Sequence, residues 1–199
     1  MARFQAAGAA SIRFTETPPD GLSRSWLGPG RRSLEIDVGC HKGRFLVEMA
    51  CKYPSANFLG IERQGQRVAK ARKKICRLGL SNAAVVQGDG LEVLSQLPDG
   101  CADYLHVLFP DPWPKRRHEG RRLVRARFLC EALRILRPHA IVRLVTDDAD
   151  YARAIQSQTA AMAEFELVQD GRDYPQTEFQ IRFLADARLI HALAARRIS

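Results

Sequence analysis

Residues 35–43 read Glu-Ile-Asp-Val-Gly-Cys-His-Lys-Gly, a strand-like run that ends in a turn with two glycines. A helical pattern, Arg44 to Cys51, follows at once, so the stretch predicts a strand that opens directly into a helix. Glycines at such a turn let backbone N–H groups approach a ligand. The three-glycine dinucleotide pattern is absent because His41 stands where a middle glycine is expected, which disfavours a nicotinamide cofactor.

The same alternation of strand and helix continues along the chain. The predicted strands are Leu34 to Val38, Asn57 to Ile61, Ala83 to Val86, Tyr104 to Leu108, Ile141 to Val145 and Phe165 to Val168. Further helices are predicted at Gln64 to Leu78, Arg121 to Leu136 and Asp148 to Met162. This order is typical of an α/β, Rossmann-like fold with a mostly parallel sheet and helices on both faces. The final segment, Leu189 to Ala195, fits a helix by propensity or a last strand by position.

Turn-forming residues mark the domain boundary. Pro18 to Gly21 and Gly28 to Gly30 predict a loosely structured lead-in over residues 1–31, followed by one domain over residues 32–199. No apolar run approaches the roughly 18 residues that a membrane span needs, and the Ala-rich start is a poor signal peptide. We therefore expect no membrane association and a cytoplasmic location. The five cysteines contain no Cys-x-x-Cys pair, and we expect them to be buried thiols in a reducing cytosol.

The charge balance points to an acidic partner. The chain has 31 Lys and Arg against 22 Asp and Glu, a net charge of +9, which favours nucleic acid over a small neutral ligand. No set of His, Cys and carboxylate side chains has metal-ligand spacing, so we predict that no metal is required. The basic helix Gln64 to Leu78 is interpreted as a solvated face, with an extended nucleic-acid footprint as the alternative.

Acidic residues follow three successive predicted strands. Asp37 ends the first strand, Glu62 comes 23 residues beyond Gly39, and Asp89 lies between two glycines after the third strand. At the spacing of Glu62, a carboxylate accepts hydrogen bonds from both ribose hydroxyls, and Asp89 is placed to accept from an adenine amino group. A single such acid is more often a solvated loop residue or a helix N-cap. Together the three acids predict a nucleoside-shaped cofactor site.

A proline-rich loop follows the fourth strand. Residues 109–118 read Phe-Pro-Asp-Pro-Trp-Pro-Lys-Arg-Arg-His, and three prolines within five residues forbid continuation of the strand. Asp111 is therefore expected on a stiff loop at a strand's carboxyl end, where ligands bind in open α/β sheets. The stretch Lys115 to Arg127 contains seven basic residues against one acid, Glu119, which suits a phosphate backbone.

These motifs carry a family resemblance. The turn at Asp37 to Gly43 resembles the acidic glycine-rich element of class I S-adenosylmethionine (SAM)-dependent methyltransferases. Residues 109–118 with Arg121 to Val124 resemble the signature of tRNA (guanine-N7)-methyltransferases. The similarity runs from about Ser33 to Arg196. It implies a seven-stranded sheet in which the last segment is a strand, and methyl transfer from SAM to N7 of a guanosine in the tRNA variable loop, position 46.

The resemblance also implies roles for individual residues. It places the cofactor beside Asp37, Gly39, Glu62, Asp89 and Asp111, with Asp111 as the catalytic residue facing both cofactor and base. It assigns the substrate to Lys115, Asp147, Thr177 and Gln180, and the RNA backbone to Arg117, His118, Arg121 and Arg122. The chain departs from the family pattern at His41, at Glu119-Gly120 and at Gln180, where glycine, a polar or basic pair and glutamate are usual. Whether the enzyme is a monomer or a homodimer is undecided by the sequence.

The proposed chemistry needs no base, because guanine N7 already has an exposed lone pair. Asp111 and Asp147 are suited to accept from guanine N1–H and N2–H and to stabilise the cationic methylated ring. Gln180 would contribute orientation without charge. Trp113 is interpreted as packing within its loop, with base stacking as the alternative, and His106 as a hydrogen-bonded core residue.

Two other functions fit part of the pattern. A methyltransferase that acts on an exocyclic amino group would also use a loop like Asp111-Pro112-Trp113, although the cation run after it suits structured RNA. A catalytically inactive RNA-binding domain is the other, and the four acids Asp37, Glu62, Asp89 and Asp111 argue against it.

Overall fold

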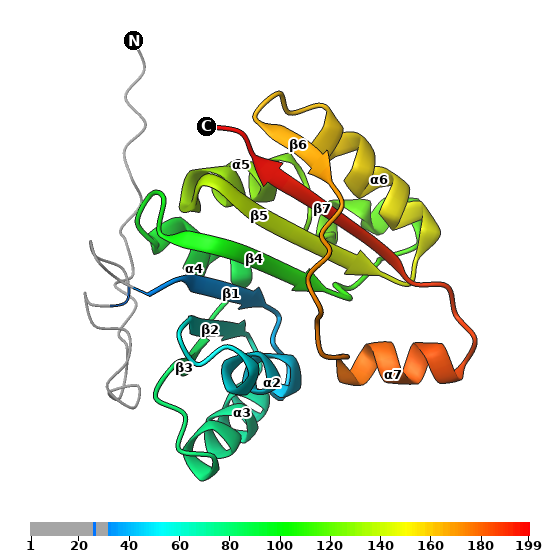
Figure 1. The fold of residues 1–199 in the computed structure, drawn as a ribbon. Helices are drawn as coiled ribbons and strands as arrows, with labels where there is room; N and C mark the ends of the chain where they lie inside the picture. The colour runs from blue at the N-terminus through cyan, green and yellow to red at the C-terminus, as the bar shows by residue number, and fades with distance from the viewer. Residues whose placement is uncertain (1–25, 27–31) are drawn as a thin grey trace, which may run out of the picture.

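The structure is a computed structural model that describes Trp26 and residues 32–199 (Figure 1). In this part of the chain one sheet contains β1 (Leu34–Val38), β2 (Asn57–Glu62), β3 (Ala83–Gln87), β4 (Ala102–Leu108), β5 (Leu136–Thr146), β6 (Phe165–Val168) and β7 (His191–Arg197). The strand order is β3-β2-β1-β4-β5-β7-β6, and β7 runs antiparallel to both of its neighbours. The expected seven-stranded α/β fold is thus confirmed, and the ambiguous last segment is a strand. The lead-in predicted for residues 1–31 lies, Trp26 apart, outside the described residues.

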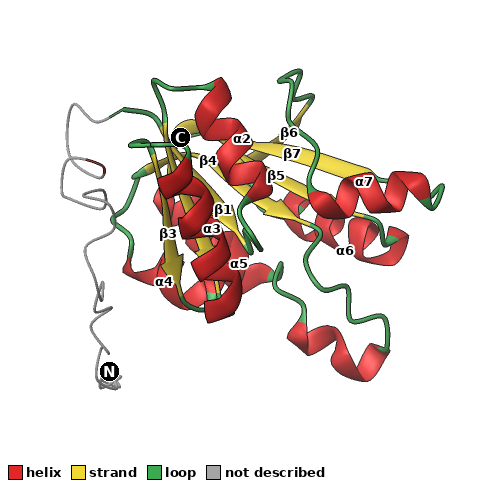
Figure 2. Cartoon of the chain, turned by 90° about the horizontal axis from the view of Figure 1, so that it is seen from below, coloured by secondary structure: helices red, strands yellow, loops and turns green. Residues whose placement is uncertain are grey.

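Helices cover both faces of the sheet (Figures 1 and 2). One face packs against α2 (Arg44–Lys52) and α3 (Gly65–Arg77), with a core built around Phe45, Met49, Phe58 and Ile75. The other packs against α4 (Gly90–Gln96), α5 (Ala126–Ile135) and α6 (Ala149–Ala160). The spacing of buried Val68, Ala71 and Ile75 on α3 is the amphipathic pattern that the sequence predicted.

The last helix, α7 (Glu178–Ala185), differs from the others because none of its residues is fully buried. It lies at the edge of the sheet where β1 and β4 end, reached by the segment 169–177 after β6 (Figure 1). Its N-cap is Thr177, whose hydroxyl accepts a hydrogen bond from the Gln180 N–H at 2.9 Å. The sequence analysis missed both α4 and α7, which are short helices.

The helix predicted from Arg121 to Leu136 is wrong at both ends. A 3-10 helix, η1 (Arg116–Arg121), comes first, α5 begins only at Ala126, and Leu136 already belongs to β5. A long-range contact holds the segment between η1 and α5 in a non-helical conformation, because the Val124 N–H donates to the Tyr151 hydroxyl at 2.9 Å. Pro138 lies within the first residues of β5.

Two smaller expectations have different outcomes. Cys40 and Cys101 are buried, but Cys51, Cys76 and Cys130 are exposed, so the expectation of five buried thiols is wrong; none of the five is in a disulfide bond. The exposed ones lie on the outward faces of α2, α3 and α5, away from both cores. Among the described residues, no helix has both the length and the apolar character needed to cross a membrane.

Candidate active site

The carboxyl ends of the parallel strands bring the predicted acids to one edge of the sheet. In the register of the sheet, Val38 pairs with Ile61 and Val107, while Leu108 pairs with Val145. The residues that follow these positions therefore share one edge, where open α/β sheets bind ligands. In Figure 1 the arrowheads of β1 and β4 point toward the side of the molecule where α7 lies.

The turn after β1 exposes its backbone. Gly39 has a φ of +82°, and a Cβ built on it meets no atom within 4 Å, so open space lies over this backbone. The N–H groups of Gly39 and Cys40 both donate to the carbonyl of Ile61, at 2.8 and 3.0 Å, which fixes the turn against β2. His41 also has a positive φ, 52°, which explains why glycine suits this position in the family pattern.

Glu62 organises the turn from the end of β2. Its side chain is buried, and its two oxygens accept from the backbone N–H groups of His41 at 3.0 Å and Gln64 at 2.8 Å. Arg67 lies 3.8 Å from the same carboxylate. Glu62 thus joins the glycine turn to the start of α3, and a carboxylate oxygen has capacity for a further hydrogen bond, for example from a ribose hydroxyl.

Asp37 is a buried acid at the end of β1. Burial raises the pKa of Asp37 from 3.8 to about 7, with nearby Glu62 adding to the shift and Arg143 opposing it. Arg143 lies in the same cross-strand row, because Asp37 pairs with His106 and His106 with Arg143. The Asp37 carboxyl can therefore gain or lose a proton near neutral pH, and a cationic ligand would favour the ionised form.

His106 is a core residue, as predicted. It is 1% exposed and its Nε2 lies 3.1 Å from Glu35 Oε2. Burial lowers its pKa, with the Glu35 hydrogen bond acting in the opposite direction. Arg172 of the segment 169–177 donates to the other Glu35 oxygen at 2.8 Å, which ties that segment to β1.

Asp89 lies at the end of β3 as expected, and it is the N-cap of α4. Its Oδ1 accepts from the N–H groups of Leu91 and Glu92, at 3.0 and 3.4 Å. The capping role that the sequence analysis weighed as an alternative is therefore real. It does not exclude ligand binding, because Asp89 is exposed and Oδ2 makes no such capping bond.

The Asp111 loop is shaped by unusual backbone angles. Phe109 and Trp113 have φ values of 55° and 44°, in the left-handed region that costs a residue with a side chain about 1–3 kcal/mol. The N–H of Phe109 donates to the carbonyl of Val145 at 2.7 Å, which anchors the start of the loop beside β5. Asp111 itself is exposed, and its side chain makes no hydrogen bond to the described residues.

Arg122 supports this loop from within. The residue is 8% exposed, its Nε donates to the Pro112 carbonyl at 2.7 Å, and its guanidinium lies 5.0 Å from the Tyr151 ring centroid. These contacts enclose the guanidinium and hold the Asp111 loop in place, while the expected contact between Arg122 and RNA stays a prediction.

The other predicted RNA-binding residues are accessible or pack on the loop surface. Arg121 lies over the Trp113 ring at 5.0 Å, and the His118 ring meets the Trp113 ring edge-on at 5.8 Å. The packing interpretation of Trp113 agrees with these contacts. Arg117 and Lys115 are exposed, and Arg117 donates to His118 at 3.4 Å.

Helix α7 joins the cofactor-side turn to the Asp111 loop. Phe179 contacts His41 with ring centroids 5.2 Å apart, and Phe183 contacts Phe109 at 5.4 Å. Glu178 lies 3.3 Å from His41 Nδ1, and Lys42 and Lys74 lie 3.7 and 3.9 Å from the same carboxylate. The pocket after β1 is accordingly lined by residues of β1 and its turn, of α2, of the end of β4 and of the α7 segment, including Asp37, Gly39, His41, Phe45, Leu108, Thr177 and Phe179.

Asp147 and Gln180 are positioned by different contacts. Asp147, at the end of β5, forms an ion pair with Arg188, which follows α7 and also lies over the Phe183 ring at 4.8 Å. Gln180 lies in the first turn of α7 and is half-buried. The family resemblance points to the segment 177–180 as a substrate contact, Glu178 and Phe179 included, whereas no sequence motif marks Arg143 or Arg188.

A larger hollow lies between α6, β6 and β7, lined by residues such as Leu144, Ile155, Leu167 and Leu193. Its lining contains no Asp, Glu, Lys or Arg, so it offers none of the charged groups gathered after β1. Among the described residues, no group of three or more His, Cys, Asp or Glu side chains could hold a metal ion.

Comparisons with known proteins agree with the fold. Residues 31–191 match a family model described as a putative methyltransferase. Among solved structures, a variant of the 16S rRNA (adenine(1408)-N(1))-methyltransferase from Catenulisporales acidiphilia superposes with a TM-score of 0.60 at 17% identity, covering 91% of each chain. The fold and the strand-end site define a SAM-dependent methyltransferase of the Rossmann-like class, and SAM is its methyl donor.

Two curated relatives narrow the family. A tRNA (guanine-N(7)-)-methyltransferase from Paracoccus denitrificans is 34% identical over 172 residues, covering 84% of this chain and 73% of the relative. One of the same name from Lacticaseibacillus casei is 37% identical, covering 82% and 80%. The chain belongs to the tRNA (guanine-N7)-methyltransferase family.

Proposed function

We propose that this enzyme transfers the methyl group of SAM to N7 of the guanosine at position 46 in the tRNA variable loop. The observation that carries the proposal is the placement of the Asp111 loop, with its cations, at the same sheet edge as the glycine turn and Glu62. The relatives' names and the family signature support the acceptor atom and the RNA class. As part of the same proposal, the enzyme acts in the cytoplasm, where its free thiols stay reduced.

The cofactor half of the site is proposed to hold SAM. The open space over Gly39 gives room for the methionine part, Glu62 accepts from the ribose hydroxyls, and Asp89 Oδ2 accepts from the adenine amino group. Asp37 is ionised by the positive charge of the ligand, which offsets part of the cost of its burial. When bound, SAM supplies an electrophilic methyl group on a positively charged sulfur.

The substrate half is proposed to hold guanine in line with that methyl group. N7 needs no deprotonation, so the protein's main task is to position the reacting atoms about 3–3.5 Å apart. Asp111, at the boundary with the cofactor half, accepts from guanine N1–H and N2–H and stabilises the positive charge that develops on the ring. Asp147 completes the contacts to the base and ribose together with Thr177, Gln180 and Lys115. Arg188, which pairs with Asp147 in this structure, is then displaced from that carboxylate or shares it with the substrate. Arg117, His118 and Arg121 bind the backbone.

The test is incubation with labelled SAM and bulk tRNA, followed by nucleoside analysis. The proposal predicts 7-methylguanosine, and it predicts that a transcript with adenosine in place of guanosine 46 accepts no label. Label in an exocyclic-amine product would instead support the other methyltransferase chemistry that the Asp111-Pro112-Trp113 loop resembles. Binding of SAM without transfer to any tRNA would contradict the proposed acceptor.

A further inference from the structure

Helix α3 has a charge composition unlike that of the other helices. Six of its thirteen residues are cationic and none is acidic, whereas α2, α4, α5, α6 and α7 each contain at least one Asp or Glu. Cations that follow one another at i, i+3 and i, i+4, such as Lys70 with Lys73 and Lys74, repel each other and weaken a helix. A solvated face gains solubility from mixed charges, so this arrangement is unfavourable unless an anion approaches it.

Three of the six cations are used inside the protein. Arg67 lies 3.8 Å from Glu62, Lys74 lies 3.9 Å from Glu178, and Arg72 donates to the carbonyl of Val85 at 3.2 and 3.0 Å. Glu62 and Glu178 both belong to the candidate active site. These contacts therefore fix α3 against the rim of the site and set the direction in which the helix faces.

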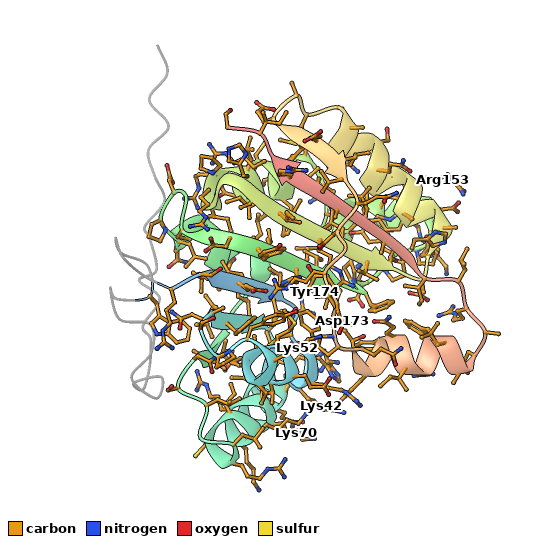
Figure 3. The ribbon with its side chains drawn as sticks, in the orientation of Figure 1. Lys42, Lys52, Lys70, Arg153, Asp173 and Tyr174 are labelled. Atoms are coloured by element: carbon orange, nitrogen blue, oxygen red, sulfur yellow. The ribbon has the colours of Figure 1, made fainter. Side chains whose placement is uncertain are left out.

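The remaining three cations, Lys70, Lys73 and Arg77, are exposed. Within the described part of the chain they form neither an ion pair nor a hydrogen bond through their side chains. Lys70 lies between Arg67 and Lys74 along the helix, so the first of the three exposed cations is next to the two residues that contact Glu62 and Glu178 of the candidate active site. Lys42, Lys52 and Lys70 all come from the part of the molecule built by α2 and α3 (Figure 3). We call Lys70, Lys73 and Arg77 the α3 cation group.

The α3 cation group lies across the site from the cations after β4. Strand β1, with its glycine turn, is between β2 and β4 in the sheet. The chain leaves β2 into α3 on one face, and leaves β4 through the Asp111 loop into η1 and α5 on the other. An RNA whose target base enters at the end of β1 would thus meet positive charge on both sides of the entry point.

We propose that the α3 cation group binds the phosphate backbone of the same tRNA at a distance from the target guanosine. This inference rests on the proposed function for its substrate class. It extends the RNA-binding surface beyond the loop after β4, to a helix on the opposite face of the sheet. The contacts are electrostatic and independent of base identity.

The test compares two double neutralisations. Lys70→Gln with Lys73→Gln removes two charges from α3, and Arg153→Gln with Arg196→Gln removes two exposed charges from α6 and β7. For each, tRNA binding is measured against salt, and SAM binding and the rate of methyl transfer at saturating tRNA are measured separately. Each lost phosphate contact lowers the log-log salt slope by about 0.7 for a single strand and about 0.9 for B-DNA. The α3 variant should therefore lose about 1.4–1.8 from the slope and bind tRNA roughly 10- to 30-fold more weakly at 0.15 M salt.

SAM binding and the saturated rate should stay at wild-type values in both variants. The α3 variant should also melt no lower than wild type, because removing like charges relieves repulsion, and Lys70→Arg with Lys73→Arg should bind tRNA normally. An α3 variant with the salt slope and tRNA affinity of the α6–β7 control would overturn the inference. If wild-type protein instead fails to methylate tRNA at all, the proposed function fails first, and the two failures are distinguished.

Discussion

The two halves of the site are built in different ways. On the cofactor side, Asp37 and Glu62 are 4% and 5% exposed, and Glu62 is bonded to backbone N–H groups within a few residues of its own strand or the neighbouring turn. On the substrate side, Asp111 is exposed on a proline-rich loop, and Asp147 depends on Arg188, forty-one residues away. Parallel register places the acids of the first half, and α7 contacts its turn through His41, whereas the second half requires α7 and Arg122 to pack correctly.

Because the two halves are built differently, variants of the two halves should change different properties. Changes on the cofactor side should alter SAM binding together with stability, because the acids are also part of the structure. Changes on the substrate side should alter methyl transfer or RNA binding while the fold stays intact, except where a residue such as Arg122 supports the loop.

The largest effect is expected for Asp111→Ala. The side chain makes no bond to the described residues, so the melting temperature should change little, while methyl transfer should fall by more than about 100-fold, the range for loss of one preorganised electrostatic group. Single-turnover rates at saturating SAM and tRNA measure this, with Asp150→Ala on α6 as an exposed control. Activity within tenfold of wild type would remove Asp111 from the reaction.

Glu62→Ala should have the next largest effect, on SAM affinity. Loss of the proposed ribose contacts, each a hydrogen bond to a charged group of about 1.5–3 kcal/mol, should weaken SAM binding by at least about tenfold. Because the N–H groups of His41 and Gln64 lose their acceptor, stability should fall as well. Calorimetry and thermal melts measure the two effects, and Glu62→Gln, which keeps one acceptor oxygen, should be milder in both. Unchanged SAM affinity in Glu62→Ala would mean that the cofactor lies elsewhere.

Asp37 should make both SAM binding and stability depend on pH. With a pKa of about 7 in the folded protein, the carboxyl must ionise to pair with cationic SAM, so affinity should drop about tenfold from pH 8 to pH 6. The pKa of Asp37 in the folded protein is raised above the unfolded value of 3.8, so the protonated carboxyl contributes to the free energy of unfolding. This contribution is fully present below about pH 4, decreases as the pH rises toward 7 and is lost once the pH has passed through 7. Asp37→Asn should flatten both profiles. If the pH profiles of SAM affinity and stability in Asp37→Asn match those of wild type, the titrating group is a residue other than Asp37.

Two neighbouring arginines should separate support from RNA contact. Arg122→Gln should lower stability, since it removes the bond to the Pro112 carbonyl and the contact with Tyr151, and should leave the salt slope of tRNA binding unchanged. Arg117→Gln should leave stability unchanged and reduce the slope by roughly 0.7–0.9. If Arg122→Gln instead reduced the salt slope and left stability unchanged, Arg122 would be an RNA contact.

The smallest effect is expected for Gln180→Glu. Gln180 is half-buried in the first turn of α7, where a carboxylate is favourable at the positive end of the helix. Methyl transfer should stay within about threefold of wild type, as for loss or gain of one partly solvated contact. A collapse of activity would show that the site is built around the amide.

Most of the geometry on the proposed cofactor side follows from the sequence, because each of its parts is local. Strand periodicity, the glycine turn and an acid directly after a strand lie within a few residues of one another, and parallel register then brings Asp37 and Glu62 together. Even there, the capping role of Asp89 and the contact of His41 with α7 depend on partners that periodicity does not reveal.

The substrate side was predicted less fully, because its structure depends on distant contacts. The aromatic contact of Phe109 with Phe183 spans more than seventy residues, and a short helix without a buried face, such as α7, has no strong apolar period. Arg122 illustrates the limit, since a cation in a basic run predicts an RNA contact, and only the folded loop reveals the Pro112 carbonyl as its partner.

A crystal structure of the protein with S-adenosylhomocysteine would test the division of the site most directly. We expect the ribose hydroxyls on Glu62, the adenine amino group near Asp89 and the sulfur facing Asp111, with the Thr177–Gln180 end of α7 bordering the ligand. Ligand bound away from the glycine turn, for example in the hollow between α6 and β7, would contradict it.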